Sequence, residues 1–386
     1  MSISEIINHL GEEREKYFNA VSPPVIQSSN FCFPSVQSMR EALGNEFQKH
    51  VYTRGNNPTV EILRKKIAAL EGAEDALITS SGSAAISCAV IANLKQGDHV
   101  VCVRKPYTWT NILLNQLLVR FGIETTMVDG RDPDNFRKAI RQETRMFYLE
   151  SPNSILLELQ DLKAVAAIAR QHSILTVIDN SFCTPLYQRP LESGIDIVIH
   201  TGTKYLAGHS DVVAGVICSN REMIKKIFAS ELMTLGGIIS PHDAWLMIRG
   251  LRTLPIRLKQ SSESAHKIAS WIEHHPKVEK VLYPFLETSD QYELAKRQMS
   301  GCSGMFSVIL KTDSIDKIEK FCESLRLFLL AVSWGGFESL VFPAVAMFDQ
   351  GSATKSDVPW NLVRFYIGLE DPEDLMADLS IAVNNL

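Results

Sequence analysis

Between residues 76 and 219, short apolar segments alternate with stretches in which apolar residues recur at helical spacing. Short apolar runs bounded by turn residues are typical of buried strands, and their alternation with helices predicts a mostly parallel sheet covered by helices on both faces. The predicted strands are 76–79, 99–103, 124–128, 146–149, 175–179, 195–199 and 211–219. The predicted intervening helices are 84–93, 110–121, 133–141 and 162–172. The fold class is therefore α/β.

The length of 386 residues exceeds that of one compact domain. Residues 1–58 lack the alternation and are rich in Pro, Ser and Asn, which predicts an N-terminal arm that packs on its own subunit or embraces a neighbour. Residues 59–250 form the predicted large domain. Helices expected at 240–254 and 261–274, separated by Pro255, mark its end. Residues 251–386 form a predicted small α/β domain, with elements at 278–283, 303–310, 314–325, 330–334, 363–367 and 372–382.

Composition excludes several classes of protein. The net charge of −5 argues against a nucleic-acid surface, which needs clustered Lys and Arg. No apolar run reaches the roughly 18 residues that span a bilayer, and the acidic start of the chain is unlike a secretory signal. The seven cysteines are scattered without a CxxC pair, which favours reduced thiols. We therefore expect a cytoplasmic protein with no nucleic-acid partner, no membrane association and no metal site.

Two side chains that follow predicted strands carry the main chemical indication. Lys204 lies in a turn just after the run 195–199, and Asp179 ends the run 175–179. The carboxyl ends of parallel strands are where open α/β sheets bind ligands. A lysine held out of water can bind an aldehyde cofactor, and an aspartate can keep a pyridine nitrogen protonated. A solvated loop lysine is the ordinary alternative, but the pair favours pyridoxal phosphate.

Three further patterns are weaker when each is taken alone. The turn Ser80-Ser81-Gly82-Ser83 joins a strand to a helix and could bind a phosphate through backbone N–H groups, helped by Thr201 and Thr203. Tyr107 could stack on a pyridine ring, although packing is the commoner role. Tyr52 and Arg54 lie in the predicted arm and could reach a phosphate, or form only a surface turn.

Together, these segments resemble the Cys/Met-metabolism family of pyridoxal-phosphate enzymes, which includes cystathionine lyases, cystathionine γ-synthase and methionine γ-lyase. The most specific segment is 203–211, TKYLAGHSD, similar to the family's TKYxxGHSD. Further similar segments are YTR at 52–54 with NPT at 57–59, SSGSAA at 80–85 with Ser83 in place of the usual methionine, DN at 179–180, RGLRTL at 249–254, GFESL at 336–340, and Arg364 with GLED at 368–371.

The resemblance covers nearly the whole chain and implies an aspartate-aminotransferase-like fold (fold type I). It also implies roles for individual residues. Lys204, Tyr107 and Tyr52 would be catalytic, with Lys204 bound to the cofactor aldehyde and moving the Cα proton. Asp179 would pair with the pyridine nitrogen and Tyr107 would stack on the ring. The phosphate would be bound by Gly82, Ser83, Thr201, Thr203, and by Tyr52 and Arg54 of a neighbouring subunit. Arg364, with Ser339 and Trp334, would bind the substrate.

The resemblance further implies a homotetramer, a dimer of dimers with shared active sites, that acts on a small sulfur amino acid. Two segments favour β-elimination of cystathionine to homocysteine, pyruvate and ammonia. ESPNS at 150–154 and SWGG at 333–336 resemble bacterial cystathionine β-lyases, and Trp109 replaces the cysteine of methionine γ-lyases. NNPT at 56–59 instead resembles γ-acting members. A non-catalytic relative is disfavoured because Lys204 and Asp179 are both present.

Overall fold

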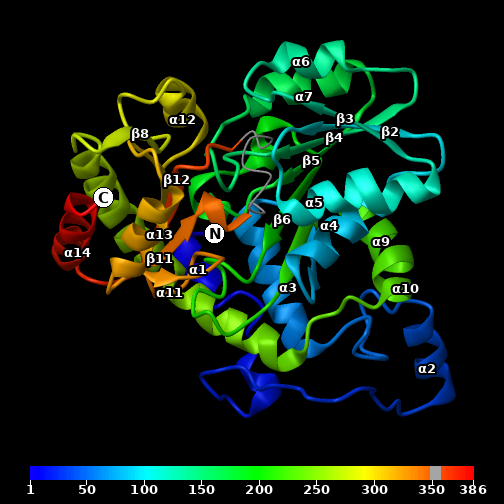
Figure 1. The fold of residues 1–386 in the computed structure, drawn as a ribbon. Helices are drawn as coiled ribbons and strands as arrows, with labels where there is room; N and C mark the ends of the chain where they lie inside the picture. The colour runs from blue at the N-terminus through cyan, green and yellow to red at the C-terminus, as the bar shows by residue number, and fades with distance from the viewer. Residues whose placement is uncertain (348–357) are drawn as a thin grey trace.

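A seven-stranded sheet forms the centre of the larger part of the molecule (Figure 1). The computed structural model describes residues 1–347 and 358–386. The strands follow the order β1-β7-β6-β5-β4-β2-β3. Neighbouring strands from β3 to β6 pair in parallel, whereas β7 is antiparallel to both β1 and β6. Their bounds are β1 Asp75–Thr79, β2 His99–Val103, β3 Glu124–Val128, β4 Thr144–Glu150, β5 Leu175–Asp179, β6 Ile197–Thr201 and β7 Gly215–Ser219.

The helices of this part lie on both faces of the sheet, as the alternation predicts. Helices α4 and α5 lie on one face of the sheet, and α6 and α7 lie on the other (Figure 1). The bounds are α3 Pro58–Glu71, α4 Gly82–Ile91, α5 Thr108–Ile112, α6 Pro133–Lys138, α7 Leu162–Gln171, α8 Thr184–Tyr187, α9 Arg221–Ile227 and α10 Met233–Leu235. Single turns of π-helix or 3₁₀-helix occupy Leu113–Leu117, Leu118–Phe121, Pro190–Ser193 and Phe228–Leu232.

Local sequence explains where these helices begin. Ser81 and Asp161 accept hydrogen bonds from the backbone N–H groups of Ala84 and Ala164, and so cap α4 and α7. Asn57 caps α3, where Pro58 occupies the first turn. Inner strands such as β2 and β6 are buried on both faces, and this is why they read as continuous apolar runs, whereas the edge strand β3 is only partly buried.

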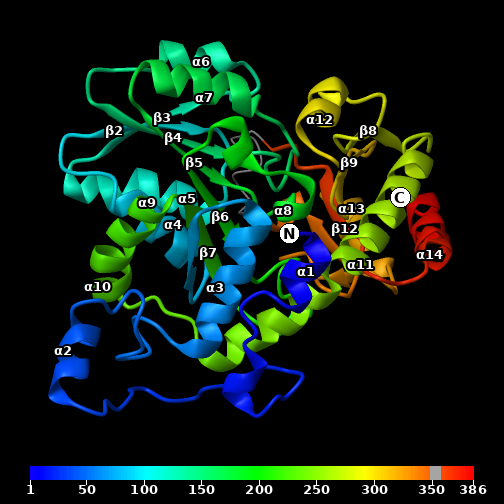
Figure 2. The same ribbon diagram turned by 180° about the vertical axis from the view of Figure 1, so that it is seen from behind.

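The N-terminal arm has two parts. Helix α1 (Ile3–Asn8) packs against α3 and the long helix α11 (Pro241–Ile272), and a 3₁₀ turn follows at Arg14–Tyr17. A fully buried ion pair, with Lys66 Nζ 3.0 Å from Glu12 Oε1, fastens this part to α3. Helix α2 (Val36–Leu43) instead projects from the body of the molecule (Figure 2). Its Val36, Met39 and Leu43 are exposed apolar residues.

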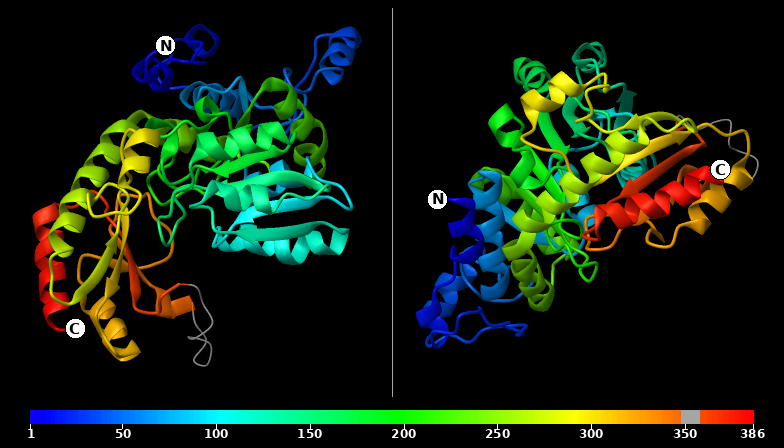
Figure 3. Two further views of the ribbon diagram at one scale, coloured as in Figure 1. Left: turned by 90° about the horizontal axis from the view of Figure 1, so that it is seen from above. Right: turned by 90° about the vertical axis from the view of Figure 1, so that its left-hand side faces the viewer.

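A single long helix, α11 (Pro241–Ile272), connects the two sheets (Figure 3). Our prediction of two helices separated by Pro255 is wrong. Proline removes one backbone hydrogen bond, but Leu251, Leu254 and Leu258 are buried on either side of Pro255, and their packing keeps the helix continuous. The proposed domain boundary at residue 250 falls inside this helix, and the division of the chain at that position stays a prediction.

The C-terminal part contains a five-stranded, mostly antiparallel sheet in the order β10-β11-β12-β9-β8. The strands are β8 Val278–Leu282, β9 Met305–Leu310, β10 Leu329–Leu330, β11 Leu340–Pro343 and β12 Leu362–Tyr366. The helices are α12 Tyr292–Gln298, α13 Ile315–Ser324 and α14 Pro372–Asn384, with a 3₁₀ turn at Ala344–Met347. The strand predicted at 330–334 is wrong beyond Leu330: residues 331–334 form a loop. Among the described helices, none is both long and apolar enough to cross a membrane.

Candidate active site

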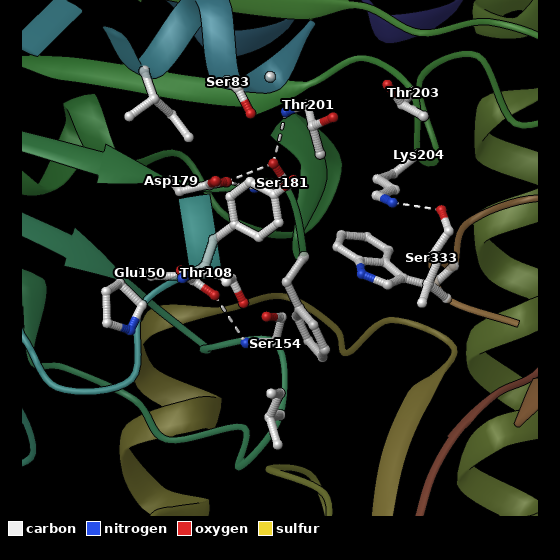
Figure 4. Close-up of a pocket in the computed structure, with 18 of the residues that line it drawn as sticks. Ser83, Thr108, Glu150, Ser154, Asp179, Ser181, Thr201, Thr203, Lys204 and Ser333 are labelled. Atoms are coloured by element: carbon white, nitrogen blue, oxygen red, sulfur yellow. Dashed lines mark hydrogen bonds between the residues drawn. The ribbon is translucent and has the colours of Figure 1, made fainter. Parts of the chain in front are cut away.

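A cavity of about 330 Å³ lies at the carboxyl ends of β4, β5 and β6. The N-terminus of α4 and the loop before α5 form other parts of its wall, and the C-terminal part contributes Ser333, Trp334 and Arg364. Figure 4 shows Lys204 and Asp179 on opposite sides of this cavity, with Ser83 and Thr201 along another margin. The topology therefore assembles residues that are far apart in the sequence into one pocket.

Lys204 lies in the turn that follows β6, and its side chain points into the cavity (Figure 4). Burial, followed by the positive charge of Arg364, lowers the pKa of Lys204 from 10.5 to about 8. Its Nζ donates a hydrogen bond to Ser333 Oγ. A lysine with this pKa is partly neutral near physiological pH, and a neutral amine is the form that attacks an aldehyde.

The turn that positions Lys204 requires a glycine. Gly208 has a φ of +72°, and a Cβ atom there would lie 1.9 Å from Arg257 Nη1. The buried Arg257 donates to the carbonyl oxygens of Tyr205 (3.0 Å) and Gly250 (2.8 Å), and so fastens the turn to α11. The glycine of the GHSD segment thus lets the arginine approach the backbone beside Lys204.

Asp179 is the last residue of β5, and only 8% of its surface is exposed. Burial raises the pKa of its carboxyl group, and hydrogen bonds from Ser181 oppose this rise. Both bonds, from the Ser181 N–H and hydroxyl groups, go to Oδ1. No described residue donates to Oδ2, so a ligand N–H could approach that oxygen. Ser181 Oγ also accepts from the Thr201 N–H group (2.7 Å), which links the ends of β5 and β6.

The N-terminus of α4 supplies the anion-binding part of the cavity. As its first residues, Gly82 and Ser83 have no intrahelical acceptors for their N–H groups, which are available to an anion. A Cβ atom at Gly82 would lie 2.7 Å from Thr201 Cβ, so a side chain there would separate the helix from β6. The hydroxyl groups of Thr201 and Thr203 contact the carbonyl oxygen of Ala214 at 3.5 and 3.3 Å, and both threonines line the cavity.

Arg364 on β12 faces the cavity from the C-terminal part. Its Nη1 and Nη2 donate to the carbonyl oxygens of Ser154 (2.9 Å) and Ser333 (3.3 Å). Burial lowers its pKa to about 10. Among the described residues, no carboxylate forms an ion pair with Arg364. A buried guanidinium without a counter-ion, at the wall of a cavity, suits the carboxylate of a ligand.

Two of the three aromatic residues predicted for the site, Tyr107 and Trp334, are in its wall. Tyr107 lines the cavity and is 40% exposed, which leaves a ring face accessible for stacking. Trp334 also lines it, and the ring centroids of Trp334 and Tyr205 lie 5.5 Å apart.

Three predicted site residues lie elsewhere. Tyr52 and Arg54 are in the arm and do not line the cavity of their own chain; the Arg54 guanidinium lies over the Tyr52 ring, 5.2 Å from its centroid. Ser339 is fully buried outside the cavity, where its hydroxyl donates to Glu370 Oε2 (2.7 Å) and accepts from the Gly368 N–H group (2.9 Å). The described geometry gives the Ser339 side chain no access to a ligand in this cavity.

Three further residues line the cavity although no site role was predicted for them: Ser181, Ser333 and Glu150. Glu150 ends β4, as Asp179 ends the adjacent β5, and the two are register partners. Polar residues at the ends of neighbouring parallel strands were the available signal for Glu150. Ser333 lay within a wrongly predicted strand, which concealed its position in a pocket loop.

The family model for Cys/Met metabolism PLP-dependent enzymes matches residues 5–384. The chain belongs to this family. An L-methionine gamma-lyase of Treponema denticola is 36% identical over 385 residues, covering 98% of this chain and 96% of the relative. A cystathionine beta-lyase of Lactococcus lactis is 36% identical over 386 residues, covering 99% of both chains. The crystal structure of metB from Corynebacterium glutamicum has a TM-score of 0.93 and 36% identity, and the match covers 100% of this chain and 98% of that one.

This Cys/Met metabolism enzyme is thus a fold type I, pyridoxal-phosphate-dependent member of a lyase family. The cavity suits the cofactor: an anion cradle at α4, a buried acid with one oxygen lacking a described donor, and a lysine of lowered pKa. Gly82, Ser83, Thr201 and Thr203 would hold the phosphate, Asp179 the pyridine nitrogen, Tyr107 the ring and Lys204 the aldehyde. When bound, pyridoxal phosphate supplies an aldehyde that condenses with amines and a ring that accepts electrons from the substrate Cα.

Proposed function

We propose that this enzyme cleaves L-cystathionine by β-elimination, in the formation of homocysteine for methionine biosynthesis. The observation that carries the proposal is that the two segments resembling bacterial β-lyases both contribute to the cavity wall. Glu150, Pro152 and Ser154 come from the first segment, and Ser333 and Trp334 from the second. Because residues at a pocket wall contact the substrate, their identity bears on which bond is broken more directly than similarity elsewhere in the chain.

The residues of the cavity can serve the steps of this reaction. Arg364 would bind the substrate α-carboxylate with its planar guanidinium. Lys204 Nζ, released by the substrate amine, would remove the Cα proton, after which the Cβ–S bond breaks and homocysteine leaves with the sulfur. The remaining three-carbon fragment takes up one water and gives pyruvate and ammonia. One proton removal at carbon is sufficient, whereas γ-elimination needs a further one at Cβ.

A second copy of the chain would complete the site. Tyr52 and Arg54 lie outside their own cavity, and the arm that carries them projects with exposed apolar residues. We propose that they reach the phosphate of a neighbouring subunit, in a homotetramer built as a dimer of dimers. Tyr52 would then be close enough to take part in catalysis. A cytoplasmic location likewise stays a prediction from the sequence.

The second candidate is a γ-acting member of the family, a cystathionine γ-lyase, cystathionine γ-synthase or methionine γ-lyase. Relatives that share 36–39% identity with nearly the whole chain are named L-methionine gamma-lyase. The NNPT segment at 56–59 also resembles this branch.

Product analysis distinguishes the two functions. We expect the holoenzyme to convert L-cystathionine to pyruvate and homocysteine, with turnover abolished in Lys204→Ala. L-methionine under the same conditions would give little 2-oxobutyrate. The appearance of 2-oxobutyrate and cysteine from cystathionine, or of 2-oxobutyrate and methanethiol from methionine, would instead establish γ-elimination.

A further inference from the structure

Glu150 joins two loops of the cavity wall through one carboxylate. Its Oε2 accepts a hydrogen bond from the backbone N–H group of Tyr107 (2.6 Å), in the loop before α5. Its Oε1 accepts from the backbone N–H group of Ser154 (2.9 Å), in the loop after β4 (Figure 4). The residue is 5% exposed and lines the cavity. Each oxygen therefore holds a different segment of chain.

The second of these bonds leads to the C-terminal part of the molecule. The Ser154 carbonyl oxygen accepts from Arg364 Nη1 at 2.9 Å. Ser154 thus contacts Glu150 through its N–H group and Arg364 through its C=O group. A continuous chain of hydrogen bonds runs from the backbone of Tyr107, through Glu150 and Ser154, to the Arg364 guanidinium.

The position is electrostatically unfavourable for a carboxylate. Burial, followed by the negative charge of its register partner Asp179, raises the pKa of Glu150, while the two backbone N–H donors favour the ionised carboxylate and oppose this rise. No described lysine, arginine or histidine forms an ion pair with it. A glutamine would avoid the charge, but its amide has only one acceptor oxygen and would turn an NH₂ group toward one of the two backbone N–H donors. Only a carboxylate satisfies both loops.

We propose that Glu150 is a positioning residue that sets the separation between the Tyr107 face of the cavity and its Arg364 wall. It acts through the backbone of Tyr107 and Ser154 and does not need to touch the substrate. The ring-stacking surface of Tyr107 and the carboxylate-binding guanidinium of Arg364 are held at a fixed separation. A bound amino acid is therefore presented to Lys204 in a fixed orientation. This inference rests on the proposed roles of Tyr107 and Arg364 in elimination.

The two backbone hydrogen bonds to Glu150 can be tested without measuring catalysis. Hydrogen–deuterium exchange of the cofactor-free protein is compared for wild type and Glu150→Gln, in overlapping peptides that isolate the amides of Tyr107 and Ser154. We expect exchange at one or both amides to accelerate at least about tenfold, since an amide that loses a charged acceptor loses most of its protection. Glu158→Gln is the matched control: this carboxylate lies in the same loop, and its Oε2 accepts from Asn153 Nδ2, but it does not contact Tyr107.

A kinetic measurement on the holoenzyme separates positioning from general destabilisation. Glu150→Gln should raise KM for cystathionine at least about fivefold, because Glu150 no longer fixes Ser154, whose carbonyl oxygen accepts from Arg364. It should also change the visible circular dichroism of the cofactor. Glu150→Gln and Arg364→Lys change the same hydrogen-bond network. The double variant should therefore raise KM by less than the product of the two single increases. Glu158→Gln should leave KM and the visible spectrum unchanged.

The outcomes are distinct. Unchanged exchange at both amides, or a fully multiplicative double mutant with normal visible circular dichroism, would overturn the positioning role, whatever the reaction. If Glu150→Gln does not fold, Glu150→Asp keeps the charge but is one methylene too short to hold both loops, and the same exchange pattern is expected. If wild type forms no pyruvate from cystathionine but exchange at the two amides accelerates in Glu150→Gln, the proposed function fails and the positioning role of Glu150 is retained.

Discussion

The side-chain nitrogen of Lys204 lies 5.3 Å from the centroid of the Trp334 indole ring. Lys204 lies in the turn after β6 of the larger sheet, whereas Trp334 lies in a loop of the C-terminal part. The two parts of the molecule therefore enclose the amine together. The ring face offers a protonated amine some stabilisation, but burial dominates and lowers the pKa of Lys204.

The first prediction concerns pH. The pKa of Lys204 is about 8 instead of 10.5, so the neutral amine that attacks an aldehyde becomes the main form above about pH 8. The rate at which cofactor-free enzyme covalently binds pyridoxal phosphate should therefore rise with pH, with a midpoint near 8, and level off well below 10.5. Stopped-flow absorbance across neutral and alkaline pH measures this rate. Trp334→Ala admits water and should move the midpoint upward; an unmoved midpoint would mean that Trp334 does not contribute to the burial.

The second prediction is that Asp179→Asn preserves the fold but slows elimination on the order of 10²-fold or more, the usual cost of removing one electrostatic partner of a developing charge. A neutral amide no longer favours a protonated pyridine nitrogen. Single-turnover absorbance measurements follow the chemical step. Asp196→Asn serves as control, because Asp196 lies at the opposite end of the sheet, bonded to Thr176. Near-normal turnover in Asp179→Asn would contradict the assignment.

The third prediction is that Arg364→Lys raises KM for amino-acid substrates about 10- to 100-fold, the equivalent of losing one hydrogen bond to a charged group. Lysine keeps the charge but not the planar pair of donors. The absorbance of the resting holoenzyme should be unchanged. A changed resting spectrum with unaltered KM would instead place Arg364 beside the cofactor.

The sequence predicted the parts of this fold that depend on local pattern. Strand β2, for example, was predicted at its observed bounds because its apolar run ends at turn residues. The continuity of α11 was missed because the packing around Pro255 is tertiary information. The short β11 and the 331–334 loop were missed for a related reason: their conformations depend on pairing with β12 and on the contact of Trp334 with Tyr205 in the turn after β6.

The same distinction applies to the site. Lys204 and Asp179 could be predicted together because both follow strands of one parallel sheet, whose carboxyl ends must share an edge. The role of Glu150 could not be predicted, because it depends on which backbone N–H groups two separate loops present to its carboxylate. For Ser339, sequence similarity gave a position but not the direction of the hydroxyl group, which faces Glu370.

The last prediction tests whether sites are shared between subunits. Tyr52 and Arg54 lie in the arm, outside the cavity of their own chain. If Arg54 binds the phosphate of a neighbouring subunit, each site takes Lys204 from one chain and Arg54 from another. Arg54→Ala and Lys204→Ala then remove residues that different chains supply to one site. Each variant alone should be nearly inactive, whereas unfolding and reassembling them together should restore part of the activity, because some hybrid sites receive Lys204 from one chain and Arg54 from the other. Turnover and the mass of the reassembled oligomers are measured on the same sample.

Reassembly of Lys204→Ala with Asp179→Asn is the control: both residues line one cavity of one chain, so no site regains both. Confirmed hybrid oligomers of the first pair without recovered activity would show that Arg54 and Lys204 serve the same chain, with the arm folded back onto its own subunit.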